Sequence, residues 1–153
     1  MRLNSKKSSN WGRYMKVLLS INPEHVENIF KGVKTFEFRR KVFARKDVTT
    51  VVVYCTMPVG RIVGEFDIDT ILEDAPEEIW EKTRYGSGIT KDFFDQYFSD
   101  RKIAYALKIG EVREYEEYID PKEVLDNFTP PQSYMYMKDE RRKAVCQDQL
   151  EFW

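Results

Sequence analysis

Apolar positions change from a continuous run to a helical spacing just after residue 21. The segment 15–21, MKVLLSI, is a short apolar run that predicts a buried strand. Asn22 then suits a helix N-cap, and Pro23 suits the first helical position. Apolar residues follow at the spacing i, i+3, i+4, i+7, which predicts a helix of about two to three turns with one buried face. These residues are Val26, Ile29, Phe30 and Val33, and Gly32 suits the C-terminal cap.

The next segment, KGVKTFEFRRK at 31–41, changes to a period of two. Phe36 and Phe38 alternate with charged residues, and successive residues of a strand point to opposite faces. If the two phenylalanines face a core, Glu37 and Arg39 share the other face. The pattern alone leaves two interpretations open: this second face is exposed to solvent, or it lines a polar pocket.

Further strands are predicted downstream. The segment 49–56, TTVVVYCT, is β-branched and almost continuously apolar, which is typical of a central strand buried on both faces. The segment 61–69 is the next strand, in which Gly64 indicates a bulge or a close backbone approach. The segments 102–110 and 112–119 follow, and we expect them to pair as a hairpin.

Short helices separate and follow these strands. Pro76 begins one helix, a second covers about 90–98, and a third begins after Asp120. The segment 129–138 is extended at first, because a residue before proline is displaced from the helical region. The helices are too short and irregular for regular parallel crossovers. We therefore expect an α+β fold, a mostly antiparallel sheet of five to six strands, curled toward a barrel, with short flanking helices.

Length and composition indicate one domain. It covers residues 15–138 of the 153-residue chain, between a flexible leader (1–14) and a charged C-terminal tail (139–153). The hydrophobic fraction of 42% is ample for a core. No apolar run is long enough to span a bilayer or to form a signal peptide, so we expect a cytoplasmic protein with no membrane partner. Cys55, Cys146 and one histidine do not make a disulfide framework or a zinc site, and no cofactor or metal is predicted.

Charge is distributed unevenly along the chain although the net charge is only −1. Residues 31–46 carry a net charge of +6, whereas residues 65–82 carry −7 and residues 111–126 carry −5. A local basic zone of this kind can contact phosphates. The alternative is that each charged run is a solvated face, which charge alone does not exclude.

Three segments, in order, resemble one known family. LLSINPEHVENIFKGVKTFEFRR contains a Gly-x-Lys-x-x-Glu-x-Arg signature, YGSGITKDFFDQYFSDRKIAYALKIGEV is similar to the family's middle segment, and PPQSYMYM is similar to its closing strand. The family is the ASCH domain, a branch of the pseudouridine-synthase-and-archaeosine-transglycosylase (PUA)-like superfamily. The resemblance covers about residues 15–137. It implies a β-barrel with a cleft at the signature and binding of RNA or a nucleotide, and some relatives hydrolyse an acyl group from a modified cytidine.

The signature residues are the centre of the predicted site. The structural role open to Lys34 is contact with the last carbonyl groups of the preceding helix. The functional roles are contact with a ligand phosphate, or action as a general base if burial lowers its pKa. Glu37 can accept hydrogen bonds from a base edge, and Arg39 can bind phosphate or stack on a ring, although the two can also simply pair with each other. The remaining predicted ligand-binding residues are Ser20, Thr35, Arg40, Gln132, Ser133 and Tyr134.

Two positions near this site have a structural alternative. Tyr134 is either a stacking platform for a base or a packed residue that closes the barrel. His25 is beside Val26 but off the apolar stripe of its helix, so we expect an exposed helix residue.

Three functions follow from these residues. The first is an RNA- or nucleotide-binding module that recognises a modified base in RNA metabolism or its regulation. The second is a hydrolase that acts on a modified nucleoside or on RNA, with Lys34 and Glu37 as catalytic candidates. The known acetylcytidine amidohydrolase pattern is incomplete, because Glu37 stands where a threonine is expected and YGSGIT offers no glutamate. The third is a protein-interaction module, and the oligomeric state is left open.

Overall fold

The structure is a computed structural model of the chain, and it describes residues 15–138. The predicted leader (1–14) and charged tail (139–153) lie outside the described residues. Within residues 15–138, no helix has both the length and the apolar composition that crossing a membrane requires.

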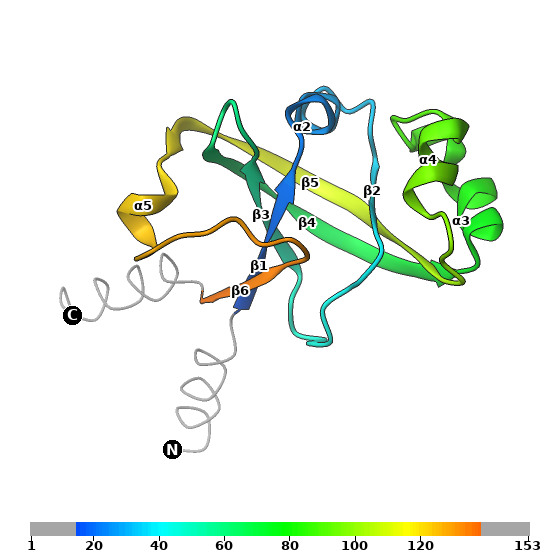
Figure 1. Ribbon diagram of the computed structural model, residues 1–153. Helices are drawn as coiled ribbons and strands as arrows, with labels where there is room; N and C mark the ends of the chain where they lie inside the picture. The colour runs from blue at the N-terminus through cyan, green and yellow to red at the C-terminus, as the bar shows by residue number, and fades with distance from the viewer. Residues whose placement is uncertain (1–14, 139–153) are drawn as a thin grey trace, which may run out of the picture.

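The described residues form one mixed sheet of six strands with short helices around it (Figure 1). The spatial order is β2-β5-β4-β3-β1-β6, and every pairing is antiparallel except β1 with β3. The predicted α+β class is therefore confirmed, but the sheet stays open instead of closing into a barrel. The strands are β1 (Met15–Ile21), β2 (Phe36–Arg39), β3 (Thr50–Cys55), β4 (Arg61–Asp74), β5 (Ala104–Ile119) and β6 (Met135–Lys138). The helices are α2 (Pro23–Phe30), α3 (Pro76–Thr83), α4 (Lys91–Tyr97) and α5 (Pro121–Val124), with a 3-10 turn at Arg84–Gly86.

Helix α2 begins and ends where the local sequence signals place it. Asn22 is the extended N-cap residue and Pro23 is the first helical residue. Gly32 has φ +80°, a left-handed conformation that ends the helix and favours glycine. Val26 and Ile29 are buried in a core cluster with inward-facing residues of β1 and β3. Phe30 packs against the same cluster, so this face holds α2 over the sheet (Figure 1). The prediction that Val33 shares the buried face is wrong, because Val33 lies beyond the end of α2 and is 58% exposed.

The two longest strands, β4 and β5, pair antiparallel along most of their length (Figure 1). The prediction of two strands joined as a hairpin is wrong for 104–119, because β5 is continuous through Gly110. Pairing with β4 over this length, with several register shifts, outweighs the local flexibility of the glycine. The prediction of a close backbone approach at Gly64 is confirmed, since a Cβ there would collide with the carbonyl oxygen of Arg113.

A second core cluster lies between β2 and the helices α3 and α4. Phe36 and Phe38 are buried in it together with Ile79 and Phe94. The Phe38 and Phe94 rings make an edge-to-face contact, with centroids 5.2 Å apart. The alternation predicted for 31–41 is thus present: the phenylalanines point into this cluster, and the charged residues of β2 point elsewhere.

Candidate functional site

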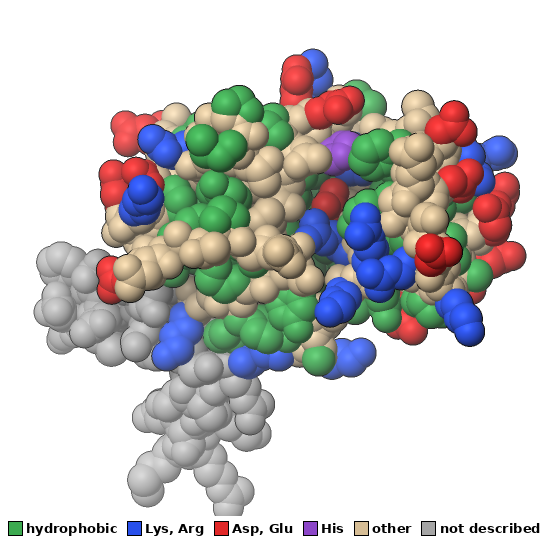
Figure 2. Space-filling view, in the orientation of Figure 1, with side chains coloured by type: hydrophobic (Ala, Val, Ile, Leu, Met, Phe, Trp, Pro, Cys, Tyr) green, Lys and Arg blue, Asp and Glu red, His purple; other side chains and the backbone are tan. Residues whose placement is uncertain are grey.

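A polar pocket of about 260 Å³ lies where edge strand β2 approaches β1 without pairing to it. We call it the seam pocket. Figure 2 shows it as a hollow below the single histidine, with a carboxylate at the bottom and basic side chains on its lower rim. Its walls come from β1, α2, β2, α4 and the segment before β6. The lining residues are Ser20, Ile21, Asn22, His25, Lys34, Glu37, Phe38, Arg39, Ile89, Phe93, Tyr97 and Gln132.

Arg39 bridges the open seam. Its Nη1 atom lies 3.1 Å from Glu37 Oε2 and donates to the carbonyl oxygen of Ser20 on β1 at 3.4 Å. Its Nη2 atom donates to the carbonyl oxygen of Ser133, just before β6, at 2.7 Å. Ser20 Oγ also donates to the carbonyl oxygen of Pro131 at 2.9 Å. These contacts connect the strand edges that the sheet leaves unpaired, and they fix the position of the guanidinium group.

Glu37 places a carboxylate in this pocket. Its side chain is buried and its Oε2 atom pairs with Arg39. Within residues 15–138, no donor bonds to the second oxygen, Oε1. Glu37 therefore retains an acceptor that a ligand can use, while its charge is balanced by the arginine.

Lys34 is buried beside the carboxylate, with only 2% of its surface exposed. Its Nζ atom donates to the carbonyl oxygen of Ser87 at 2.7 Å and lies 4.7 Å from the centre of the Phe38 ring. Burial lowers the pKa of Lys34, and the negative charge of Glu37 partly opposes that shift. Gly88 allows this packing, because its φ is +67° and a Cβ there would lie 2.7 Å from Lys34 Cβ. The GxKxxExR segment and the YGSGIT segment thus meet at the lysine.

His25 and two aromatic residues form the opposite wall. The prediction that His25 is an exposed helix residue is wrong, because it is partly buried and its ring meets the edge of Phe93 at a centroid distance of 5.5 Å. Burial and the nearby Lys34 charge lower the pKa of His25. Its Nδ1 atom is buried without a hydrogen-bond partner among the described residues. Tyr97 donates to the carbonyl oxygen of Phe38 at 3.2 Å, and burial raises the pKa of its hydroxyl group.

A second pocket, of about 420 Å³, adjoins the first and has a strongly basic lining. We call it the basic trench. It shares Arg39, Tyr97 and Gln132 with the seam pocket, so the two pockets are neighbours across these side chains. Its other lining residues are Arg40, Lys41, Arg101 and Ser133, with no acidic residue among them. The Arg40 guanidinium lies 4.3 Å from the centre of the Tyr97 ring, a cation–π contact that orients it along the trench.

The structure brings together seven of the nine predicted ligand-binding residues. Ser20, Lys34, Glu37, Arg39 and Gln132 line the seam pocket, while Arg40 and Ser133 line the basic trench. Thr35 and Tyr134 line neither. Thr35 bonds to the carbonyl oxygen of Gly86 through its backbone and its hydroxyl group. Tyr134 packs against the first core cluster, with its ring 6.1 Å from that of Phe43.

No sequence motif indicates the other residues that line the two pockets. Phe93, Tyr97 and Arg101 come from a helix and a loop that are distant in the chain from the signature, and His25 lies off the apolar stripe of its own helix. The aromatic side of the 90–98 helix was the one available signal, and it equally indicates a core contact. The pocket's aromatic wall therefore emerges only from the tertiary structure.

Comparison with known proteins identifies the class to which this fold belongs. The crystal structure of ASCH from Zymomonas mobilis superposes with a TM-score of 0.75 at 24% identity, covering 86% of this chain and 94% of that chain. An ASCH domain-containing ribonuclease from the same species is 26% identical over 133 residues, covering 85% of this chain and 90% of the relative. The resemblance to the ASCH domain is thus confirmed.

A family model also matches the chain. Residues 14–128 match the family described as "Domain of unknown function (DUF365)", and the chain belongs to that family. The large ribosomal subunit protein uL22 of Ureaplasma parvum is 28% identical over 124 residues. That match covers 80% of this chain, which spans only 39% of the length of this relative.

Proposed function

We propose that this protein binds RNA or a nucleotide, with one base in the seam pocket and the adjoining phosphates along the basic trench. The adjacency of the two pockets is the observation that carries the proposal. A ligand that joins a ring with polar edges to an anionic backbone matches a polar pocket that lies next to a cationic trench. The relative named as an ASCH domain-containing ribonuclease supports RNA as the polymer.

The seam pocket offers groups that suit the edge of a base. Glu37 Oε1 and the neutral His25 ring are acceptors, and Arg39 and Gln132 are donors. Phe93, which is 44% exposed and lines the seam pocket, supplies an aromatic surface on which a base can stack. A walled pocket of this size also distinguishes a modified base from an unmodified one, because an added group changes both the fit and the hydrogen bonds. We include such a base among the ligands.

The basic trench supplies sequence-independent affinity. Arg40, Lys41 and Arg101 are the three cations that the trench adds to the shared Arg39. If each neutralises one phosphate of a single strand, the logarithm of the binding constant should fall with the logarithm of salt concentration with a slope of about −2.

Fluorescence anisotropy with a short labelled single-stranded RNA tests the proposal. Arg101→Ala should weaken binding several-fold and reduce the salt slope by about 0.7, because one phosphate contact is lost. Lys122→Ala is the matched control, since Lys122 is an exposed cation on α5 and lines neither pocket. Glu37→Gln should change the preference among bases and leave the salt slope unchanged. Salt-independent binding, or equal effects of Arg101→Ala and Lys122→Ala, would refute the proposal.

A second candidate function is hydrolysis of RNA or of a modified nucleoside. The buried Lys34 favours it, because a lowered pKa increases the fraction of neutral amine that can accept a proton. In RNA cleavage, the amine would take the proton of a 2′-hydroxyl group as that oxygen attacks phosphorus and the bond to the 5′-oxygen breaks. The 5′-oxygen would take a proton from water, which leaves a 5′-hydroxyl end and a 2′,3′-cyclic phosphate.

Substrate panels distinguish hydrolysis from binding alone. Cleavage of RNA, read by gel electrophoresis, should disappear with a 2′-deoxy substrate and with Lys34→Met, and mass spectrometry should detect products from a panel of modified nucleosides. If every substrate stays intact while RNA still binds in the anisotropy assay, the protein is a binding module and the hydrolase function is excluded.

A further inference from the structure

A large apolar groove lies apart from the seam pocket and the basic trench and shares no residue with either. Its volume is about 630 Å³. It runs between β3, β4, the C-terminal end of β5, helix α5 and β6. The apolar residues that line it are Val52, Ile62, Ile119, Val124, Leu125 and Met137. Val124 is 54% exposed. An apolar concavity of this size on one domain is typical of an interaction site.

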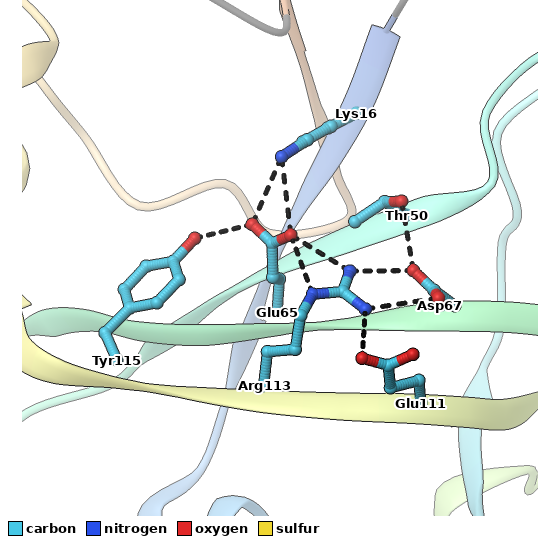
Figure 3. A network of polar contacts seen from close by, with 7 residues as sticks. All are labelled: Lys16, Thr50, Glu65, Asp67, Glu111, Arg113 and Tyr115. Atoms are coloured by element: carbon cyan, nitrogen blue, oxygen red, sulfur yellow. Dashed lines mark hydrogen bonds and ion pairs between the residues drawn. The ribbon is translucent and has the colours of Figure 1, made fainter. Parts of the chain in front are cut away.

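Polar side chains at one end of the groove have a structural role. Glu65 accepts from Tyr115 Oη at 2.6 Å and from Arg113 Nη2 at 2.9 Å, and it pairs with Lys16 Nζ at 3.1 Å (Figure 3). Burial alone would raise the pKa of Glu65, but these partners outweigh burial and lower the pKa to about 2. Glu65 is therefore ionised and committed to ion pairs at neutral pH, which makes it unsuitable as a general acid or base. The groove is better suited to docking than to catalysis.

We propose that this groove is the docking site of the chain's own C-terminal segment, residues 144–153. Strand β6 ends at Lys138, and Lys138 itself lines the groove. The chain continues for 15 residues beyond it. Even a partly compact segment of this length reaches along the groove, since an extended residue spans about 3.3 Å.

The sequence of this segment matches an apolar groove. Cys146, Leu150 and Trp153 stand at i, i+4 and i+7, the spacing of one helical face, and Phe152 adds a second aromatic ring beside it. Charged and amide residues occupy most of the other positions. A segment of this kind buries its apolar face only if a complementary surface is available, and the groove begins where the segment is attached.

Covalent attachment strengthens weak docking. A short tether gives an effective concentration in the millimolar range. A segment that binds as a separate peptide with a Kd of about 0.1 mM would therefore occupy the groove most of the time. The N-terminal segment is a poorer occupant, because its large apolar residues Leu3, Trp11 and Tyr14 are sparse among small polar and basic residues.

A peptide-binding experiment tests the proposal. A labelled peptide of residues 139–153 should bind a chain that ends at Lys138 with one-to-one stoichiometry, measured by fluorescence anisotropy. The full chain should bind it at least tenfold more weakly, because its own segment competes. Val124→Asp in the shortened chain should reduce binding at least tenfold. Val33→Asp is the matched control, since Val33 is 58% exposed and lies outside the groove.

Changes in the peptide keep the test independent of protein folding. Leu150→Asp and Trp153→Asp in the peptide should each abolish binding. Gln147→Asp should not, because Gln147 is not part of the apolar stripe. No binding to the shortened chain would overturn the proposal, as would equal binding to the Val124→Asp variant. Binding of a peptide of residues 1–14 in place of 139–153 would overturn it as well. A concentration-dependent dimer of the full chain that Val124→Asp dissociates would assign the groove to a second copy and equally reject the proposal.

Discussion

Replacement of Glu65 by glutamine tests how much the buried network of Figure 3 contributes to stability. Glutamine keeps the shape of the side chain but removes its charge. Only 3% of the Glu65 surface is exposed, so little solvent compensates for the loss. The amide group would also direct a donor at Arg113 or Lys16, which are themselves donors. The variant therefore removes charge-assisted hydrogen bonds without creating a cavity.

The magnitude follows from the pKa. Folding lowers the pKa of Glu65 from its ordinary 4.5 to about 2. Each tenfold change in proton affinity corresponds to about 1.4 kcal/mol, so ionised Glu65 contributes about 3 kcal/mol to the free energy of unfolding at neutral pH. A carboxylate with a lowered pKa contributes this stability above its unfolded pKa and loses it as pH falls through the folded pKa. The contribution is therefore complete above about pH 4.5 and disappears toward pH 2.

Urea denaturation at several pH values measures this effect. The wild type should exceed Glu65→Gln by about 3 kcal/mol at neutral pH, and the two free energies should converge as pH falls below 4.5. Asp69→Asn is the control, because Asp69 pairs with Lys108 at 3.5 Å where both side chains are at least half exposed. It should change stability by less than about 0.5 kcal/mol. A difference for Glu65→Gln that stays constant with pH would refute the reasoning, because the loss would then come from packing and not from ionisation.

Three further predictions concern packing and protonation. Gly64→Ala should lower the free energy of unfolding by about 1–3 kcal/mol in urea, because the added methyl group would collide with the carbonyl oxygen of Arg113. His25 is the only histidine and folding lowers its pKa, so the melting temperature should fall as pH drops through 6.5, and His25→Gln should remove that fall. Burial lowers the pKa of Lys34, so stability should rise with pH in the alkaline range below 10.5, and Lys34→Met should abolish the rise in calorimetric scans.

Strong local signals explain what the sequence predicted correctly. The run at 15–21 became β1, and the spacing from Pro23 became α2. The alternation of Phe36 and Phe38 correctly separated the two faces of β2. In each case the residues that specify the element are neighbours along the chain, so periodicity and capping suffice.

Contacts between distant segments explain what the sequence did not predict. A hairpin was predicted between 102–110 and 112–119, yet β5 continues through Gly110. The strand is continuous because β4 pairs with β5 on both sides of that glycine. His25 is off the apolar stripe of α2, but α4 packs Phe93 beside it and the ring becomes part of a pocket wall. The expected curl of the sheet led to the prediction of a barrel. Closure of a barrel, however, depends on whether the two edges of the sheet meet. No local sequence pattern specifies whether they do.

The open seam places one arginine both in the fold and beside the proposed binding site. A closed sheet would connect β2 to its neighbour with a ladder of backbone hydrogen bonds, and no space for a ligand would remain between them. Here Arg39 makes the connection through the carbonyl oxygens of Ser20 and Ser133, and the space beside its guanidinium group becomes the seam pocket. Arg39→Ala would therefore loosen the fold and weaken the ligand contact together. Two other variants separate the effect on the fold from the effect on binding. Arg101→Ala changes only the basic trench, and Glu37→Gln keeps the shape of the seam pocket.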